Sequence, residues 1–230
     1  MVYIEPWECC PTLKELSQIT HEARRRSGGK TLIIAGYIDH NFTESVLLTD
    51  TTIFSSTGQR LELGEYRRLL SGPYLPDDYG IMNESLAVHL LKYYDFFTRY
   101  RELFEGKLKP FENVDEICAS ASAEPEANKI WISLLDSRKA FLMNLVNYVG
   151  INELDWRKPL NKPKKLVNID LIIPFELGPF DEPCFYFISA DGQLKPEKMP
   201  VDIKHNGYNI RVPYLHYWSS ILIIPKREEE

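Results

Sequence analysis

The pattern of apolar residues changes near residue 110, and this change restricts the fold more than any other feature of the sequence. Before it, apolar runs of strand length alternate with segments of helical periodicity. After it, short segments with alternating apolar and polar residues follow one another, separated by turn-forming pairs such as Asn206-Gly207. The first pattern is typical of an α/β unit with parallel strands, and the second is typical of antiparallel β-structure.

The first part contains candidate strands at residues 2–7, 31–38 and 51–56 and candidate helices at residues 11–27 and 41–48. Residues 11–27 carry apolar side chains at helical spacing and end in three arginines before Gly28-Gly29, which predicts a helix with a cationic last turn. Thr43 is a candidate cap for the short helix. The nearly continuous apolar run 31–38 favours a strand buried on both faces of a parallel sheet.

A long helix is predicted over residues 82–104, with Asn83 or Ser85 as its cap and an aromatic stripe that is typical of core packing. Beyond it, we expect strands at residues 129–135, 140–148, 166–175, 184–189, 199–204, 208–212 and 219–224. Trp218 is expected in the sandwich core.

These patterns predict an α/β fold followed by an all-β fold. Residues 1–110 are expected to form the carboxyl-terminal part of a (β/α)8 barrel, a partial barrel made of its last strands, and residues 111–230 an antiparallel β-sandwich. The boundary is expected between residues 108 and 113. A complete barrel needs eight strands, and the first part has room for about three. We therefore expect an upstream barrel segment to be missing from this chain.

Glu5 is the main candidate for chemistry. It follows an alternating strand and precedes Pro6, with Tyr3 and Trp7 on either side. In barrels of this class the chemistry lies at the carboxyl ends of the strands, and Tyr37 ends the next predicted strand. An isolated glutamate beside a proline is more often a surface residue, and the aromatic side chains are equally compatible with interior packing.

Glu62 and Glu65 flank Gly64 in the loop after the third predicted strand. Carboxylates in such a loop often bind sugar hydroxyls. The alternative is that they pair with Arg60, Arg67 or Arg68.

The composition bears on partners. A formal charge of -6 and a pI near 5.5 argue against nucleic acid as a main partner, because phosphate binding needs a basic surface. There is no apolar segment of membrane length and no secretory leader, so no membrane partner is predicted. The four cysteines are expected to be free thiols, and the five histidines lack ligand spacing, so neither a metal nor a cofactor is predicted.

Several motifs occur in an order that resembles the carboxyl-terminal half of glycoside hydrolase family 66, which contains dextranases and cycloisomaltooligosaccharide glucanotransferases. They are Tyr3-x-Glu5-x-Trp7, residues 33–37 (IIAGY), 61–65 (LELGE), 74–76 (YLP), 93–96 (YYDF), 189–192 (SADG) and 212–218 (VPYLHYW). The resemblance covers essentially the whole chain and implies a (β/α)8 barrel followed by a β-sandwich.

The resemblance also implies a retaining reaction on α-1,6-linked glucan (dextran), which requires a nucleophile and an acid/base close together. Glu5 takes the acid/base position, and Tyr3, Trp7, Tyr37, Glu62 and Glu65 are the implied substrate-binding residues. The family's nucleophilic aspartate lies on an earlier strand, before this chain begins. We therefore expect the chain alone to be inactive.

Two departures concern sugar contacts. Residues 57–60 read Thr-Gly-Gln-Arg where the family usually has Gly-Gly-x-His, and residues 75–78 read Leu-Pro-Asp-Asp where it favours Phe-Pro-Asn. The expected ligand is still an α-glucan or oligosaccharide. Full-length members of the family are expected to be secreted or at the cell surface.

Two other readings stay open. In one, the chain is a non-catalytic carbohydrate-binding or structural β-sandwich module. In the other, a partner chain supplies the rest of the barrel. The sequence does not distinguish hydrolysis from transfer or cyclisation.

Overall fold

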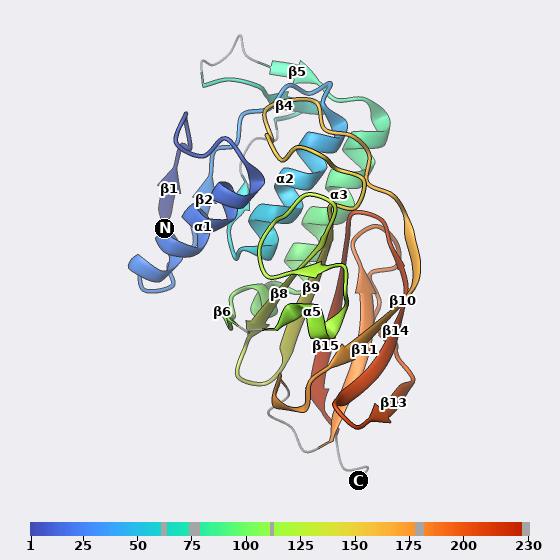
Figure 1. The fold of residues 1–230 in the computed structure, drawn as a ribbon. Coiled ribbons are helices and arrows are strands. Elements are labelled where there is room, and N and C mark those ends of the chain that lie inside the picture. The colour runs from blue at the N-terminus through green and yellow to red at the C-terminus, as the bar shows by residue number, and fades with distance from the viewer. Residues whose placement is uncertain (61–63, 74–78, 111–112, 178–181, 227–230) are drawn as a thin grey trace.

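A computed structural model describes residues 1–60, 64–73, 79–110, 113–177 and 182–226. The chain forms a small parallel sheet, a layer of helices and a pair of antiparallel sheets (Figure 1). Helices α2 and α3 lie in the middle of the molecule, with β1, β2 and α1 on one side and the long antiparallel strands on the other. A short parallel sheet and helices precede the large antiparallel sheets along the chain, which agrees with the coarser part of the predicted fold class.

The parallel sheet has the order β1-β2-β3, with β1 at Val2–Ile4, β2 at Leu32–Ile34 and β3 at Gln59–Arg60. Helix α1 (Leu13–Arg26) connects β1 to β2, and its amino terminus carries a capping box between Thr12 and Glu15. The three arginines of its last turn match the predicted cationic end. All three strands end at the same edge of the sheet, because they run in parallel.

Helix α2 (Thr43–Ser55) corrects two predictions. The expected strand at residues 51–56 is wrong, because these residues continue the helix that was expected to end at residue 48. Every residue from Ser45 to Ser55 is buried, so the segment has no exposed face to reveal helical periodicity. The hydroxyls of Thr51 and Thr52 donate to carbonyls one turn earlier. The helix begins after Phe42 rather than at a Thr43 cap.

The predicted long helix is two helices, α3 (Glu84–Arg99) and α4 (Arg101–Phe104), separated at Tyr100. The side chain of Asn83 accepts a hydrogen bond from the Leu86 amide (2.9 Å), which identifies Asn83 as the cap. The hairpin of β4 (Arg68–Leu70) and β5 (Tyr79–Ile81) precedes α3.

The larger antiparallel sheet has the order β12-β11-β15-β9-β8-β6, with β7 added in parallel beside β8. The second sheet has the order β10-β14-β13, and the Lys204↔Gly207 pair closes the predicted hairpin at Asn206-Gly207. The strands are β6 Lys107–Leu108, β7 Ala121–Ser122, β8 Ile130–Asp136, β9 Phe141–Asn147, β10 Leu166–Ile173, β11 Pro183–Ser189, β12 Glu197–Lys198, β13 Val201–Lys204, β14 Gly207–Leu215 and β15 Trp218–Pro225. The short helices α5 (Val114–Ile117) and η1 (Phe175–Leu177) lie in the connections.

Two apolar cores hold these layers together. One lies between the two antiparallel sheets, with side chains from β8, β9, β11 and β15 facing those of β10 and β14. The other joins the helices to the opposite face of the larger sheet. Trp218 belongs to this second core, stacked on Phe54 of α2 (5.8 Å between ring centroids) and edge-on to Phe96 of α3 (4.8 Å). The prediction that Trp218 belongs to the core between the two sheets is therefore wrong, because the side chain packs between the larger sheet and the helices.

Candidate active site

The Glu5 carboxylate lies just beyond the carboxyl end of β1 and is exposed. The phenol hydroxyls of Tyr3 (3.3 Å) and Tyr37 (3.1 Å) both donate to its Oε1 atom. Tyr3 reaches it because residues two apart on a strand point to the same side. Tyr37 reaches it because β2 pairs with β1 in parallel, so that the chain after β2 runs past the end of β1. Three of the predicted site residues thus lie together.

Trp7 completes one wall of the site. Its side chain is 51% exposed, and its ring centroid lies 6.0 Å from that of Tyr37. Glu5, Trp7 and Tyr37 line an open hollow of ≈ 540 Å³, whose other walls come from the Pro11 region, residues 71–73 and the segment around Asp155. Burial, followed by hydrogen bonds to Tyr3 and Glu5, raises the pKa of Tyr37, so its phenol remains a neutral donor.

Arg157 holds the loop between β1 and α1 and was not predicted. Its Nη2 atom donates to the carbonyls of Pro6 and Trp7, and its guanidinium lies 3.9 Å above the ring of Trp156. The Trp156 indole donates to the carbonyl of Cys10 (2.7 Å). About 150 residues separate this clamp from the loop, so local sequence patterns carry no signal for it.

Both acidic and basic side chains line the hollow. Asp155 lies on its wall, but its carboxylate is paired with Lys158 Nζ (2.8 Å) and accepts from the Arg157 amide (3.2 Å). Glu8 is a further carboxylate on the wall and is exposed. Asp155 and Glu8 both come after Glu5 in the chain, whereas the family resemblance implies a nucleophile that comes before it.

The remaining predicted contacts do not gather at this hollow. Glu65 is exposed in the turn before β4 and is not among the described residues that line the hollow, while Glu62 lies outside the described residues. Arg60, at the position where the family resemblance predicts a histidine, is buried and paired with Asp50 of α2 (2.8 Å, both side chains 1% exposed). It also donates to the carbonyl of Gly36 (3.1 Å), so Arg60 fixes the end of the parallel sheet.

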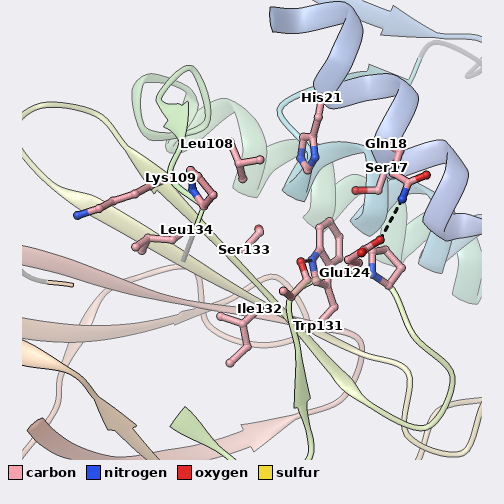
Figure 2. A pocket seen from close by; sticks show the side chains of 13 residues that line it. Ser17, Gln18, His21, Leu108, Lys109, Glu124, Trp131, Ile132, Ser133 and Leu134 are labelled. Atoms are coloured by element: carbon pink, nitrogen blue, oxygen red, sulfur yellow. Dashed lines mark hydrogen bonds between the residues drawn. The ribbon is translucent and has the colours of Figure 1, made fainter. Parts of the chain in front are cut away.

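A second hollow of ≈ 220 Å³ lies between α1 and β8 (Figure 2). The His21 imidazole points into it from α1, and the hydrogen bond from Gln18 to Glu124 (3.0 Å) crosses one end. Within the described part of the chain, His21 Nε2 is buried and has no hydrogen-bond partner. Burial lowers the pKa of His21 to about 4, so the imidazole is neutral at pH 7. This hollow shares no described lining residue with the one beside Glu5.

Two features are absent from the described ranges. They contain no group of three or more His, Cys, Asp or Glu side chains placed to hold a metal ion. None of their helices has the length and apolar character needed to span a membrane.

Comparison with protein families gives a match to the family described as "Glycosyl hydrolase family 66", over residues 1–222. A cycloisomaltooligosaccharide glucanotransferase of Niallia circulans is 26% identical over 190 residues, which are 77% of this chain and 19% of that protein. Another of the same name and organism is 27% identical over 130 residues, 54% of this chain and 13% of that protein. The chain thus spans less than a fifth of the length of these curated relatives.

Solved structures show the same fold. A Paenibacillus sp. cycloisomaltooligosaccharide glucanotransferase, in complex with cycloisomaltoheptaose, matches with a TM-score of 0.82 and 16% identity over 96% of this chain and 51% of that one. An α-amylase of Geobacillus thermoleovorans, in complex with acarbose, matches with a TM-score of 0.55 and 11% identity over 96% of this chain and 46% of that one.

Proposed function

Because the chain belongs to glycoside hydrolase family 66, we propose that it is the carboxyl-terminal portion of a retaining enzyme acting on α-1,6-glucan, with Glu5 as the general acid/base. The observation that carries the proposal is the Glu5 carboxylate at the end of a parallel strand. It is held by two phenol donors and faces an open hollow beside an exposed tryptophan.

The geometry suits the acid/base role. Tyr3 and Tyr37 both contact Oε1, and no hydrogen bond from a described residue reaches Oε2. In this proposal, Oε2 would be the oxygen that faces the glycosidic oxygen. In a retaining reaction Glu5 would give its proton to the leaving sugar, and then take a proton from the incoming water or sugar hydroxyl. Water as the acceptor gives hydrolysis, and a sugar hydroxyl gives transfer.

Trp7 would supply a face for a sugar ring, since its half-exposed indole lies on the wall of the hollow. Tyr37 is hydrogen-bonded to Glu5 and lies close to the Trp7 ring. It would therefore lie between the bond that reacts and the sugar ring stacked on Trp7. Arg157 would act as a positioning residue, because it fixes the backbone of the loop on which Trp7 stands.

The three parallel strands with α1 and α2 would be the last part of a (β/α)8 barrel, and residues 111–230 its β-sandwich. The nucleophile would come from an earlier strand, in the part of the enzyme that this chain does not span. In a retaining enzyme it would lie about 5 Å from Glu5. Asp50 is unsuited to that role because it is buried against Arg60. Asp39 instead accepts hydrogen bonds from its neighbour Asn41.

We expect the purified chain to release no reducing sugar from dextran, because a catalytic pair loses most of its rate when one member is absent. The measurement is reducing-end release, compared between the unaltered chain and Glu5→Gln. Turnover by the unaltered chain that disappears in Glu5→Gln would contradict the missing nucleophile while supporting Glu5 as the acid/base.

Binding tests the site without requiring turnover. Titration of the chain with an isomaltooligosaccharide should give saturable binding that falls by about 2- to 12-fold in Trp7→Ala, since stacking on an aromatic side chain contributes on the order of 0.5–1.5 kcal/mol. Phe175→Ala is the matched control, because Phe175 is the one exposed aromatic among residues 113–177 and 182–226, and it lies in the sandwich part.

The alternative is a carbohydrate-binding module in which the sandwich makes the contacts. It predicts the reverse result, with binding lost in Phe175→Ala and retained in Trp7→Ala. If neither variant changes binding, or if no binding is found, the hollow beside Glu5 is not a glucan site in this chain.

A further inference from the structure

Cys9 and Cys10 form a pair of neighbouring thiols in the loop between β1 and α1. Their Sγ atoms lie 3.4 Å apart. Cys9 is exposed, whereas Cys10 is buried with 5% of its surface accessible. All four cysteines of the chain are free, and the other two stand on separate elements, Cys118 at the end of α5 and Cys184 in β11.

We propose that Cys9 and Cys10 are a modifiable dithiol. They close into a vicinal disulfide by exchange with a low-molecular-weight disulfide, and closure alters the loop that carries Trp7. The proposal stands independently of the proposed function, because it concerns the thiols and the backbone alone.

The different exposure of the two thiols sets the order of steps. The Cys9 thiolate attacks a reagent disulfide RS–SR, which forms Cys9–S–S–R and releases one RS⁻. The Cys10 sulfur then attacks the Cys9 sulfur and releases the second RS⁻. Two thiols are oxidised and one disulfide is reduced to two RSH, so atoms and electrons balance.

The Cys10 thiol is suited to the second step rather than the first. Burial, followed by the hydrogen bond to Cys9, raises the pKa of Cys10 to about 12, so little of it is thiolate at neutral pH. Attack on an adjacent mixed disulfide is intramolecular, and the high local concentration of the reacting groups offsets the small thiolate fraction.

The bond should be easily reduced. Neighbouring Cα atoms are about 3.8 Å apart, whereas disulfides usually join Cα atoms about 4.4–6.8 Å apart. Strained disulfides of this kind have more oxidising potentials and behave as labile bonds. The dithiol would therefore respond to the redox state of its surroundings rather than form a permanent brace.

The backbone connects the thiols to the hollow beside Glu5. The Cys10 carbonyl accepts from the Trp156 indole (2.7 Å) and from Arg157 Nη1 (3.4 Å), and the same guanidinium holds the carbonyl of Trp7. Closing the disulfide must bring the sulfurs from 3.4 Å to about 2.05 Å, which requires rotation of the backbone between these anchors.

The experiment treats the full chain with glutathione disulfide, alkylates the remaining thiols and maps the peptides by mass spectrometry. We expect the peptide containing residues 9 and 10 to lose two hydrogens and to carry no glutathione. Cys10→Ser should keep glutathione on Cys9, while Cys9→Ser should leave the buried Cys10 unmodified. Dithiothreitol should restore both thiols.

Cys118→Ser and Cys184→Ser are the matched controls and should leave closure unchanged. Hydrogen exchange in a peptide spanning residues 5–12 should rise on oxidation of the unaltered chain and not in Cys10→Ser. Persistent glutathione on Cys9 of the unaltered chain, or full alkylation of both cysteines, would overturn the disulfide. Closure with unchanged exchange would overturn its coupling to the Trp7 loop.

Discussion

The buried imidazole of His21 should make the protein less stable in mild acid. In the folded chain the pKa of His21 is about 4, against 6.5 for an ordinary histidine. Below pH 6.5 the unfolded chain therefore binds a proton that the folded chain does not take up until about pH 4. Stability contributed by the neutral imidazole is present above pH 6.5 and is lost as the pH falls toward 4.

The size of the effect follows from the two values. The full difference corresponds to about 3 kcal/mol, at about 1.4 kcal/mol for each pKa unit. Between pH 7 and pH 5, where the unfolded imidazole is mostly charged and the folded one mostly neutral, the loss should be about 2 kcal/mol. Glu124 and Lys109 also line the hollow, but burial alone accounts for the lowered pKa of His21.

The assay is urea unfolding at pH 7 and pH 5, followed by circular dichroism, for the unaltered chain and for His21→Gln. The quantity that matters is the difference between the two chains in the free energy lost, because other titrating groups contribute equally to both. His205→Gln, which removes an exposed imidazole from the β13–β14 hairpin, is the control. Equal losses in the unaltered chain and His21→Gln would refute the reasoning.

Substitutions at Asp50, Asp191 and Arg157 test polar contacts by their effect on the free energy of unfolding, measured by urea titration. Asp50→Asn should cost about 3–5 kcal/mol, because it removes the charge of one partner of a buried ion pair; a cost below 1 kcal/mol would contradict a stabilising role of the Asp50 carboxylate. Asp191→Asn should cost about 1–3 kcal/mol, because its carboxylate accepts from two amides and one phenol. The exposed Asp95→Asn should change little. Arg157→Met should cost about 1–3 kcal/mol and weaken glucan binding, because the carbonyls of Pro6 and Trp7 lose their donor. Arg157→Lys should recover only part of the stability and of the binding, because an ammonium group lacks the planar donor geometry of the guanidinium.

The sequence was sufficient for elements whose signals are local. The arginine-rich end of α1, the cap of α3, for which Asn83 was one of two candidates, and the Asn206-Gly207 hairpin each depend on a few adjacent residues. Helix α2 was misread because its Thr- and Ile-containing second half resembles a strand and because burial on all sides removes the usual polar face. Tertiary packing, which the sequence pattern does not show, decides its conformation.

The candidate site divides in the same way. Glu5, Tyr3 and Trp7 were found from one short stretch, and Tyr37 from its place at the end of the next strand. Their contacts agree with that grouping, although their roles in catalysis stay predictions. Arg157 and the Arg60–Asp50 pair were not predicted. The partners of Arg157 are distant in the chain, and Asp50 lies in the second half of α2, which was expected to be a strand.

The placement of Trp218 has a consequence for how the sequence can change over time. Trp218 lies on β15, and its indole contacts aromatic rings of α2 and α3. The packing of these three separate segments is therefore interdependent. A smaller side chain at position 218 would leave a void among the rings that pack on it, which include those of Phe54, Tyr93, Phe96 and Phe104. Among related chains we therefore expect these positions to covary, so that an exchange of the sandwich between relatives succeeds only when the helices accompany it.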